Sequence, residues 1–502
     1  MKPASFFTPS PRLYFWLCLG FITILSFATY VVHFERPAAF FWDENYHIAA
    51  AQKYLNNVYF MEQHPPLGKL LIAAGESLLD LNPIDNQYIT TDYARNPPEG
   101  FSFAGYRLFP TLLAWLTAPI LFLCFWLLGR NLAMATFGSF LYAFDNAIIV
   151  HSRGAMLEST LMFFSAATIL GFLLMLENAQ SKKLMRWSAA LFGAAFAAAM
   201  TTKVVALILI LLVPAFIWLL WGKKHAILRG LGVSALAFIS VYCLVWNIHF
   251  SLGSNVEPAL SNNGYYETSE SGKQILAEGR NGTLFAFPTE LADSLKFVTR
   301  YNEGVPELDL CKDDENGSPF FLWPIGARSI NYRWETTDGG ATHRHLYLQN
   351  NPVIWGLGLL GLILTAALLI GRTLTPDAPK LKHGRMMFVF STLYVGYMVA
   401  ISQLDRVMYL YHYFTPLLFS FFLIVLALLE ITQIGRFRLT VERRNIIVLI
   451  LCAYIVAGWH FYHGFTYYEP MTKEQVQARA LLDIWDLRCV GCDHTNYVFN
   501  PR

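Results

Sequence analysis

Two adjacent carboxylates, Asp43 and Glu44, follow directly on the first hydrophobic segment of this chain of 502 residues. The same stretch continues into a turn-forming, basic hexapeptide, His64-Pro65-Pro66-Leu67-Gly68-Lys69. Carboxylates at the edge of a membrane are costly unless they are solvated or paired, and they are usually kept for chemistry. We therefore interpret the Asp43-Glu44 pair as a candidate site of proton abstraction at a membrane surface.

Other ionisable side chains lie at the ends of hydrophobic segments that are far apart in the sequence. They are His64, Lys69, Arg107, Asp145, Arg153, Glu158, Lys203, His249, Asp405, Arg406 and His412. Several cations beside carboxylates favour a reaction on a lipid phosphate held at the bilayer surface. Each residue also has a structural alternative: Arg107 or Lys203 can reach the headgroups, and Asp145 or Glu158 can pair with Arg153 to join two spans.

The composition predicts a membrane protein with many spans. Hydrophobic residues make up 55% of the chain and charged residues only 14%, and the mean hydropathy is +0.40. Soluble domains carry roughly 25% charged residues. The net charge of +2, without a basic cluster, argues against a nucleic-acid partner. The first apolar stretch, 13–32, lacks a small-residue cleavage site and is expected to remain as an anchor.

Repeated apolar runs of spanning length predict an all-α polytopic membrane protein with eleven transmembrane helices. Their expected limits are 12–32, 106–128, 132–150, 156–176, 186–201, 204–221, 229–249, 353–371, 386–402, 408–430 and 445–463. The fifth and sixth are short and are separated only by Thr201-Thr202-Lys203.

Basic residues in every second short connection predict the orientation. A cytoplasmic N-terminus, 1–32 with the first span, places these basic connections inside and leaves two large regions outside, 33–105 and 250–352. The second carries 14 acidic against 8 basic residues, which agrees with export. Spans 2–7 then occupy 106–249 and spans 8–11 occupy 353–463. The tail 464–502 lies outside, in the periplasm if the membrane is an inner, cytoplasmic one. Cys489 and Cys492 of this tail favour a structural disulfide over a redox pair.

The first exterior region is expected to hold two short helices. Asp43 is suited to cap one helix over 47–56, and Pro66 is suited to open another over 67–79. The apolar face of the second helix can lie on the membrane, with Lys69 and Glu76 on a more polar flank.

Several motifs together carry a resemblance to a known family. Phe41-Trp42-Asp43-Glu44, followed by the hexapeptide at 64–69, resembles the first exterior loop of the protein O-mannosyltransferases, membrane glycosyltransferases of the GT-C class. Further similar motifs occur in the family's order along nearly the whole chain. They are Tyr106-Arg107-Leu108-Phe109-Pro110, Phe144-Asp145-Asn146, His151-Ser152-Arg153, Leu157-Glu158-Ser159, Thr202-Lys203, Ile248-His249-Phe250, Asn351-Pro352-Val353-Ile354-Trp355 and the stretch from Arg406 through Tyr411-His412-Tyr413.

The resemblance implies inverting transfer of mannose from a polyprenyl-phosphate-linked donor to Ser or Thr hydroxyls of exported proteins. Asp43 is then the general base, and Glu44 orients the acceptor or Asp43. The leaving group is an anionic lipid phosphate, whose growing charge needs cations. The expected phosphate ligands are Arg107, Arg153, Lys203, Arg406 and His412. The expected supporting residues are His64, Lys69, Asp145, Glu158 and His249.

Two departures from the family pattern bear on this reading. Glu158 stands where the family usually has Asp, and the region 250–352 has no room for the β-trefoil module of eukaryotic members, which suggests a bacterial-type member. Two alternatives stay open: a lipid or lipopolysaccharide acceptor, as in aminoarabinose transferases, and a solute transporter. An acidic pair could hold a divalent cation, but the chain shows no His/Cys cluster with metal-ligand spacing, and metal independence is expected.

Overall fold

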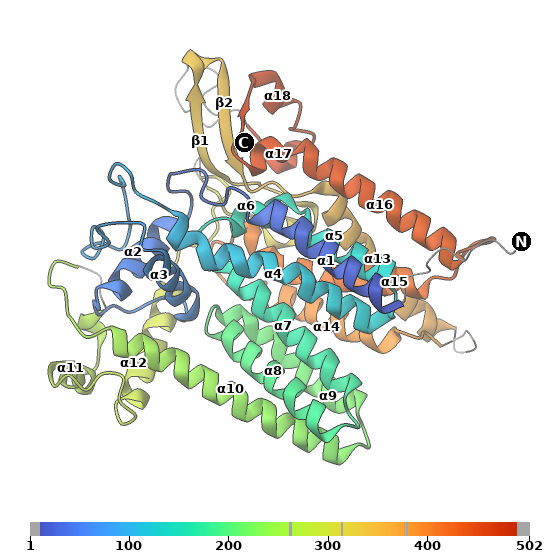
Figure 1. The fold of residues 1–502 in the computed structure, drawn as a ribbon, viewed down its shortest axis with the longest axis horizontal. Coiled ribbons are helices and arrows are strands. Elements are labelled where there is room, and N and C mark those ends of the chain that lie inside the picture. Colours follow the sequence, from blue (N-terminus) through green and yellow to red (C-terminus); the bar gives the residue numbers. More distant parts are fainter. Residues whose placement is uncertain (1–10, 261–263, 313–314, 376, 378–379, 489–502) are drawn as a thin grey trace, which may run out of the picture.

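The computed structural model describes residues 11–260, 264–312, 315–375, 377 and 380–488. Most of them belong to long helices that run along one common direction (Figure 1). Among the described residues, eight helices are long and apolar enough to cross a membrane. They are α1 (Pro11–Tyr30), α4 (Ala104–Gly129), α7 (Glu158–Glu177), α10 (Lys224–Leu252), α13 (Pro352–Leu374), α14 (Gly384–Ile401), α15 (Phe414–Glu430) with the preceding 3₁₀ turn η5 (Leu410–Tyr413), and α16 (Val441–Phe461).

The other predicted spans are also helical, but they are irregular. Helices α5 (Leu132–Ala143) and α6 (Asn146–Ser152) form one candidate span that is bent by 59°. The fifth and sixth predicted spans correspond to α8 (Lys182–Met200) and to a shorter apolar segment made of η1 (Val204–Leu211) and α9 (Leu212–Leu219). Neither of these two segments is among the eight helices, because α8 begins with charged residues and η1–α9 is short.

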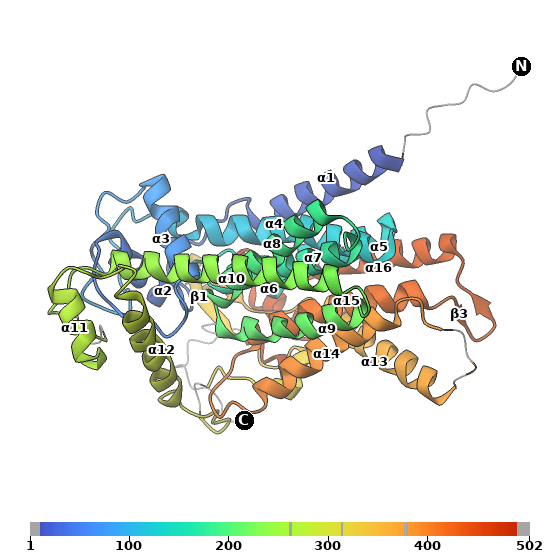
Figure 2. The ribbon, with the colours of Figure 1, turned by 90° about the horizontal axis from the view of Figure 1, so that it is seen from below.

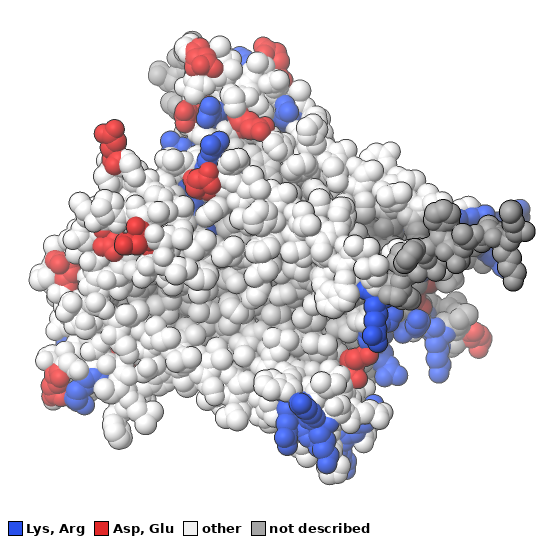
Figure 3. All heavy atoms as spheres, viewed as in Figure 1, with Lys and Arg blue, Asp and Glu red and all other residues white. Residues whose placement is uncertain are grey.

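The connecting regions of the predicted exterior gather at one end of the bundle. Helices α2 (Glu44–Leu55), α3 (Leu67–Leu79), α11 (Glu270–Ala277) and α12 (Phe287–Glu303) lie together there in both views (Figures 1 and 2). Lys and Arg atoms gather near the opposite end, around the start of α1 and the turn before α10 (Figure 3).

A small antiparallel sheet was not predicted. Strand β2 (Thr342–Tyr347) pairs with β1 (Asn331–Thr337) on one side and with β5 (Pro470–Met471) on the other. The C-terminal segment, with α17 (His463–Thr466) and α18 (Lys473–Gln477), is therefore joined to the region 250–352. Strands β3 (Gln433–Ile434) and β4 (Phe437–Arg438) form a separate hairpin. Cys489 and Cys492 lie outside the described residues.

The first exterior region partly corrects the predictions for its two helices. Asp43 occupies the N-cap position of α2, but its side chain makes no capping hydrogen bond, because it points to Tyr411 instead. Helix α3 has the predicted bounds, Leu67–Leu79, and exposes apolar residues such as Leu78. Lys69 and Glu76, however, are buried and not on an exposed polar flank, because Lys69 is paired with Glu62 and Glu76 with Asn82.

Candidate active site

Asp43 lies in a nest of aromatic rings at the predicted exterior end of the bundle. The Tyr411 hydroxyl, from the turn before α15, donates a hydrogen bond of 3.3 Å to Asp43 Oδ2. The preceding Trp42 ring stacks on Tyr332 of β1 at 5.0 Å and meets Tyr409 edge-on at 5.3 Å. Residues from the first loop, from strand β1 and from the turn before α15 thus hold Asp43 in position. Its side chain remains partly exposed.

The surroundings of Asp43 alter its acidity. Burial raises the pKa of this carboxyl above its usual value, and the nearby Glu158 carboxylate raises it further. Lys203, His151 and the hydrogen bond from Tyr411 act in the opposite direction. A carboxylate with a raised pKa accepts a proton more readily than an ordinary aspartate, which suits a general base.

Glu44 and Arg107 form a fully buried, bidentate ion pair. Arg107 Nε lies 2.7 Å from Glu44 Oε1, and Nη2 lies 2.8 Å from Oε2. The other three N–H groups of Arg107 donate to the carbonyl oxygens of Glu35, Pro37 and Ala39. All five guanidinium donors are therefore occupied. This geometry does not support Arg107 as a phosphate ligand, and Glu44 is placed to hold the loop of Asp43 and not to touch an acceptor.

Arg153 is also used within the protein. Its guanidinium donates to the carbonyl oxygens of Val32 and His33, at and just beyond the C-terminal end of α1, and lies 4.8 Å from the centre of the Tyr467 ring. Free carbonyl groups at a helix C-terminus attract cations. In the described part of the chain Arg153 forms an ion pair with neither Asp145 nor Glu158, so the predicted pairing is corrected. This residue holds α1 in place and is not positioned as a phosphate ligand.

Glu158 is the centre of a buried polar chain beside Asp43. Lys203 forms an ion pair with Glu158 Oε1, and His151 Nε2 lies 2.6 Å from Oε2. The other ring nitrogen of His151 lies 2.6 Å from the Tyr332 hydroxyl, and the His151 ring stacks on Tyr411 at 4.8 Å. The sequence did not single out His151 or Tyr332 as site residues. Only the His151-Ser152-Arg153 motif could have pointed to the histidine.

A narrow slot of about 10 Å³ lies on the membrane side of this chain. Its polar walls are Glu158, Lys203, Tyr411 and His412, and its apolar walls come from α7, η1 and α15. His412 Nδ1 lies within hydrogen-bond distance of both the N–H and the carbonyl oxygen of Tyr409, at 3.2 and 3.0 Å. The Nε2 atom is therefore the ring nitrogen that remains for a ligand. A cation, an imidazole and apolar walls suit the phosphate end of a lipid.

An open cleft of about 700 Å³ lies on the opposite, loop side of the aromatic nest. Tyr46 and Tyr409 line it near Asp43, and the C-terminal half of α12 supplies Phe297, Arg300 and Tyr301. Arg406 lies close by, half-exposed: it donates to the Asn302 side chain, whereas its buried Nε has no hydrogen-bond partner in the described part of the chain.

The hexapeptide packs the start of α3 against the slot. The Leu67 N–H donates to the Thr201 carbonyl oxygen at 2.8 Å, beside the helix break that precedes Lys203. A Cβ atom on Gly68 would come within 2.6 Å of the Leu157 side chain, so a larger residue here would have to displace that side chain. Burial and the cations Lys203 and Lys69 lower the pKa of His64 well below its usual value. His64 is thus a neutral imidazole near Lys203.

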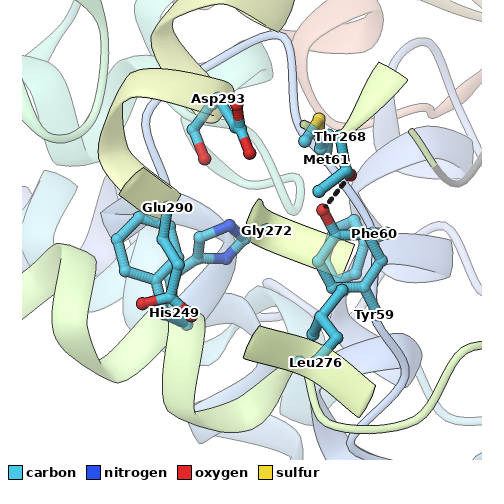
Figure 4. A pocket seen from close by; sticks show the side chains of 12 residues that line it. Tyr59, Phe60, Met61, His249, Thr268, Gly272, Leu276, Glu290 and Asp293 are labelled. Atoms are coloured by element: carbon cyan, nitrogen blue, oxygen red, sulfur yellow. Dashed lines mark hydrogen bonds between the residues drawn. The ribbon is translucent and has the colours of Figure 1, made fainter. Parts of the chain in front are cut away.

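Two predicted supporting residues lie elsewhere. Asp145 caps α6 by accepting from the Ile148 N–H at 3.0 Å, and it also accepts from Trp355 Nε1 at 2.8 Å. His249 hydrogen-bonds the Tyr54 hydroxyl at 2.8 Å and borders a separate cavity of about 30 Å³ together with Glu290 and Asp293 (Figure 4). Among the described residues, no three His, Cys, Asp or Glu side chains gather as metal ligands would.

Two family models match this chain over most of its length. Residues 20–252 match the model described as dolichyl-phosphate-mannose-protein mannosyltransferase. Residues 296–485 match the model of the C-terminal four-transmembrane region of protein O-mannosyltransferase. The two matched regions contain Asp43, Glu158 and Lys203 on the one side and Arg406 and His412 on the other.

Curated relatives agree over part of the chain. Dolichyl-phosphate-mannose–protein mannosyltransferase 4 of Schizosaccharomyces pombe is 29% identical over 217 residues, which are 42% of this chain and 28% of the relative. Protein O-mannosyl-transferase 2 of Drosophila melanogaster is 27% identical over 245 residues, which are 46% of this chain and 31% of the relative. These matches span about a third or less of each relative.

Solved structures share the fold. One chain of the Saccharomyces cerevisiae protein O-mannosyltransferase Pmt1–Pmt2 complex, bound to the sugar donor, aligns with a TM-score of 0.81 at 16% identity, over 96% of this chain and 94% of that chain. The oligosaccharyltransferase of Archaeoglobus fulgidus aligns with a TM-score of 0.51 at 12% identity, over 97% of this chain and 61% of that chain. With both halves matched by the family's own models and with the GT-C fold in common, the chain belongs to the protein O-mannosyltransferase family.

Proposed function

We propose that this protein transfers mannose from a polyprenyl-phosphate-linked donor to Ser or Thr hydroxyls of exported polypeptides, with inversion at the anomeric carbon. The observation that carries the proposal is the position of Asp43 between two different spaces. Tyr411, which donates a hydrogen bond to Asp43, lines the membrane-side slot. Tyr46, three residues after Asp43, lines the open cleft. Family membership supplies the expected sugar and acceptor.

The acceptor hydroxyl approaches from the cleft. A hydroxyl is a weak nucleophile and gains from a positioned base, and the raised pKa of Asp43 suits that task. The proton moves from the hydroxyl oxygen to a carboxylate oxygen of Asp43 while that hydroxyl oxygen bonds to the anomeric carbon. Attack from the face opposite to the leaving phosphate inverts this carbon.

The donor phosphate binds beside the slot, against Lys203 and His412, because about 10 Å³ admits no more than one water molecule. Lys203 and His412 are the phosphate ligands that this geometry favours, with Arg406 near His412 and the neutral His64 as a further hydrogen-bond partner. Glu158 holds Lys203 in place through their ion pair and also hydrogen-bonds with His151. The cations stabilise the charge that develops on the phosphate as the glycosidic bond breaks. Arg107, Arg153 and Asp145 hold the surrounding elements.

The site is placed on the exterior face, with the N-terminus in the cytoplasm and the C-terminal tail outside. The support is the gathering of Lys and Arg near the opposite end of the bundle. The test of the function is an assay of membranes with radiolabelled polyprenyl-phosphate-mannose and a Ser/Thr-rich acceptor peptide. Label that moves to the peptide and is released by β-elimination is expected. Label that moves only to lipid would favour the alternative of a lipid acceptor.

A further inference from the structure

The turn between α11 and α12 exposes two large apolar side chains. Leu284 is 83% exposed and Phe285 is 90% exposed, and the neighbouring Thr283 is exposed as well. Isolated apolar residues on a surface need no explanation, but an adjacent Leu-Phe pair at the tip of a turn, with almost no contact to its own protein, indicates a surface that has a partner.

This turn is fixed to the end of a membrane-spanning helix. Asn281 Nδ2 donates to the Phe250 carbonyl oxygen at 2.9 Å, and Asn247 Nδ2 donates to the Gly282 carbonyl oxygen at 2.5 Å. The Phe287 ring meets the Phe250 ring at 5.8 Å. Gly282 has a φ of +69°, and a Cβ atom there would overlap Ser251. Leu284 and Phe285 are thus held beside the last two turns of α10.

The depth of these two turns in the bilayer can be estimated by counting residues along α10. A hydrocarbon core of about 30 Å needs about 20 helical residues. Basic residues, ending with Arg229, mark the other end of this helix. A count from Arg229 brings the outer edge of the core to the region of His249. Leu284 and Phe285 therefore lie at the boundary between acyl chains and headgroups, where aromatic side chains are favoured.

The exposed apolar side of α10 supports the same position for the turn. Leu244 is 57% exposed and Ile248 is 41% exposed, one helical turn apart. The turn attached at 247–251 extends this apolar stripe beyond the end of the helix. Arg280 and Glu278 come directly before it, as charged groups at headgroup level would.

We propose that Leu284 and Phe285 insert into the outer leaflet of the bilayer and anchor the start of α12 there. The partner is the lipid surface itself, because the turn continues the lipid-facing stripe of α10 at the outer boundary of the core. The anchor also bears on the cleft, because the other end of the same helix supplies Phe297, Arg300 and Tyr301 to its wall. This inference does not depend on the reaction that the site catalyses.

Site-directed spin labelling of the full chain in lipid nanodiscs tests the proposal. The parent carries Ser in place of Cys311, Cys489 and Cys492, and the labelled variants are Leu284→Cys and Phe285→Cys. Either variant is sufficient if the other does not fold. Collision with oxygen, which concentrates in lipid, is compared with collision with a water-soluble nickel chelate.

Two control variants calibrate the measurement. Leu244→Cys reports the lipid-facing side of α10. Tyr266→Cys reports a residue of similar exposure, 81%, in the loop directly before α11. We expect oxygen to outweigh the nickel chelate at 284 or 285, as at 244, and the reverse at 266. An accessibility to the chelate equal to that at 266 would overturn the insertion. Protection from both reagents would equally overturn it and would point to a protein partner or a second copy.

Discussion

The Tyr411 hydroxyl reaches the Asp43 carboxylate across a sequence separation of 368 residues. The hydrogen bond joins the first loop of the protein to the turn before its penultimate span. Tyr411 also lines the slot. A movement of α15 would therefore shift the hydroxyl group that contacts the proposed base. In the proposed mechanism, this contact connects the binding of the donor to the position of Asp43.

Replacement of the proposed base should abolish transfer. Asp43→Asn is nearly isosteric, and loss of a general base typically lowers a rate by about 10² to 10⁴. Turnover of purified protein with radiolabelled polyprenyl-phosphate-mannose and acceptor peptide measures the effect. Asp80→Asn, at the exposed left-handed end of α3, is the matched control and should stay near wild type. Retention of more than half of the wild-type turnover by Asp43→Asn would remove Asp43 from the base role.

The dependence of the rate on pH should report the pKa of Asp43. A general base must be deprotonated, so the rate falls as the pH drops through its pKa. Because burial and Glu158 raise this pKa, the acid limb should lie above the value of about 3.9 for an ordinary aspartate. A pH profile of kcat/KM checks this expectation. An acid limb at the ordinary value would mean that Asp43 is solvated during the reaction.

Tyr411→Phe should move the acid limb to still higher pH. The hydrogen bond from Tyr411 stabilises the charged carboxylate, so its removal raises the pKa of Asp43. The ring remains, and with it the stacking on His151. A hydrogen bond is worth about 1 kcal/mol, or roughly a fivefold change in an equilibrium. Tyr394→Phe, which loses a hydroxyl contact with Tyr413 instead, is the control and should leave the acid limb in place.

Binding of the donor should separate from chemistry. Lys203→Ala and Arg406→Ala should each weaken the binding of a short-chain polyprenyl phosphate, because a hydrogen bond to a charged group is worth roughly 1.5–3 kcal/mol and about 1.4 kcal/mol is tenfold in affinity. Arg406→Lys should recover only part of the loss, because a point charge cannot replace the guanidinium fork. Asp43→Asn should bind at least as tightly as wild type. Titration of detergent-purified variants measures these affinities.

The outcome of that titration shows which residues bind the donor phosphate. If Arg406→Ala binds as wild type does while Lys203→Ala does not, Arg406 serves only the rim of the cleft. If neither variant loses affinity, the phosphate does not bind beside the slot.

The Glu44–Arg107 pair should matter for stability. Removal of one member of a buried ion pair typically costs about 3–5 kcal/mol, because the other charge is left unpaired. Arg107→Ala should therefore lower the thermal midpoint strongly, and Arg107→Lys should not restore it, since three backbone carbonyl groups also depend on the fork. Arg95→Ala, an exposed arginine over the Tyr93 ring, is the control. A normal thermal midpoint for Arg107→Ala together with lost donor binding would instead identify Arg107 as a ligand of the donor phosphate.

Orientation can be checked with fusions. A reporter that is active only in the cytoplasm should be active after Lys224 or Arg438 and silent after Gly282 or at the C-terminus. An active C-terminal fusion would mean an even number of spans, with the Thr201–Lys203 break as the first place to look.

The sequence predicted the helices better than the roles of the charged residues. Hydrophobic length and the proline signal were enough to place α3 at Leu67–Leu79, because both are local properties. The pattern also indicated that cations gather at one face. It could not tell Arg107, whose donors are taken by nearby carbonyl groups, from Lys203, which faces a slot. That difference depends on how the loop 33–42 folds back, which no local pattern encodes. The β1–β2–β5 sheet was missed for the same reason, since its third strand is 123 residues away in the sequence from β2.

The contacts of Arg153 have a consequence for how the chain is assembled in the membrane. The carbonyl groups at the end of α1 cannot be satisfied by that helix alone, and unsatisfied backbone groups are costly near lipid. Their donors are Arg153 and the Tyr467 hydroxyl, which lies 2.9 Å from the Thr29 carbonyl oxygen. The end of α1 is therefore completed only when Tyr467, which lies 438 residues after Thr29, has been synthesised. A chain that stops before α17 therefore leaves the Thr29 carbonyl group at the end of α1 without its Tyr467 donor.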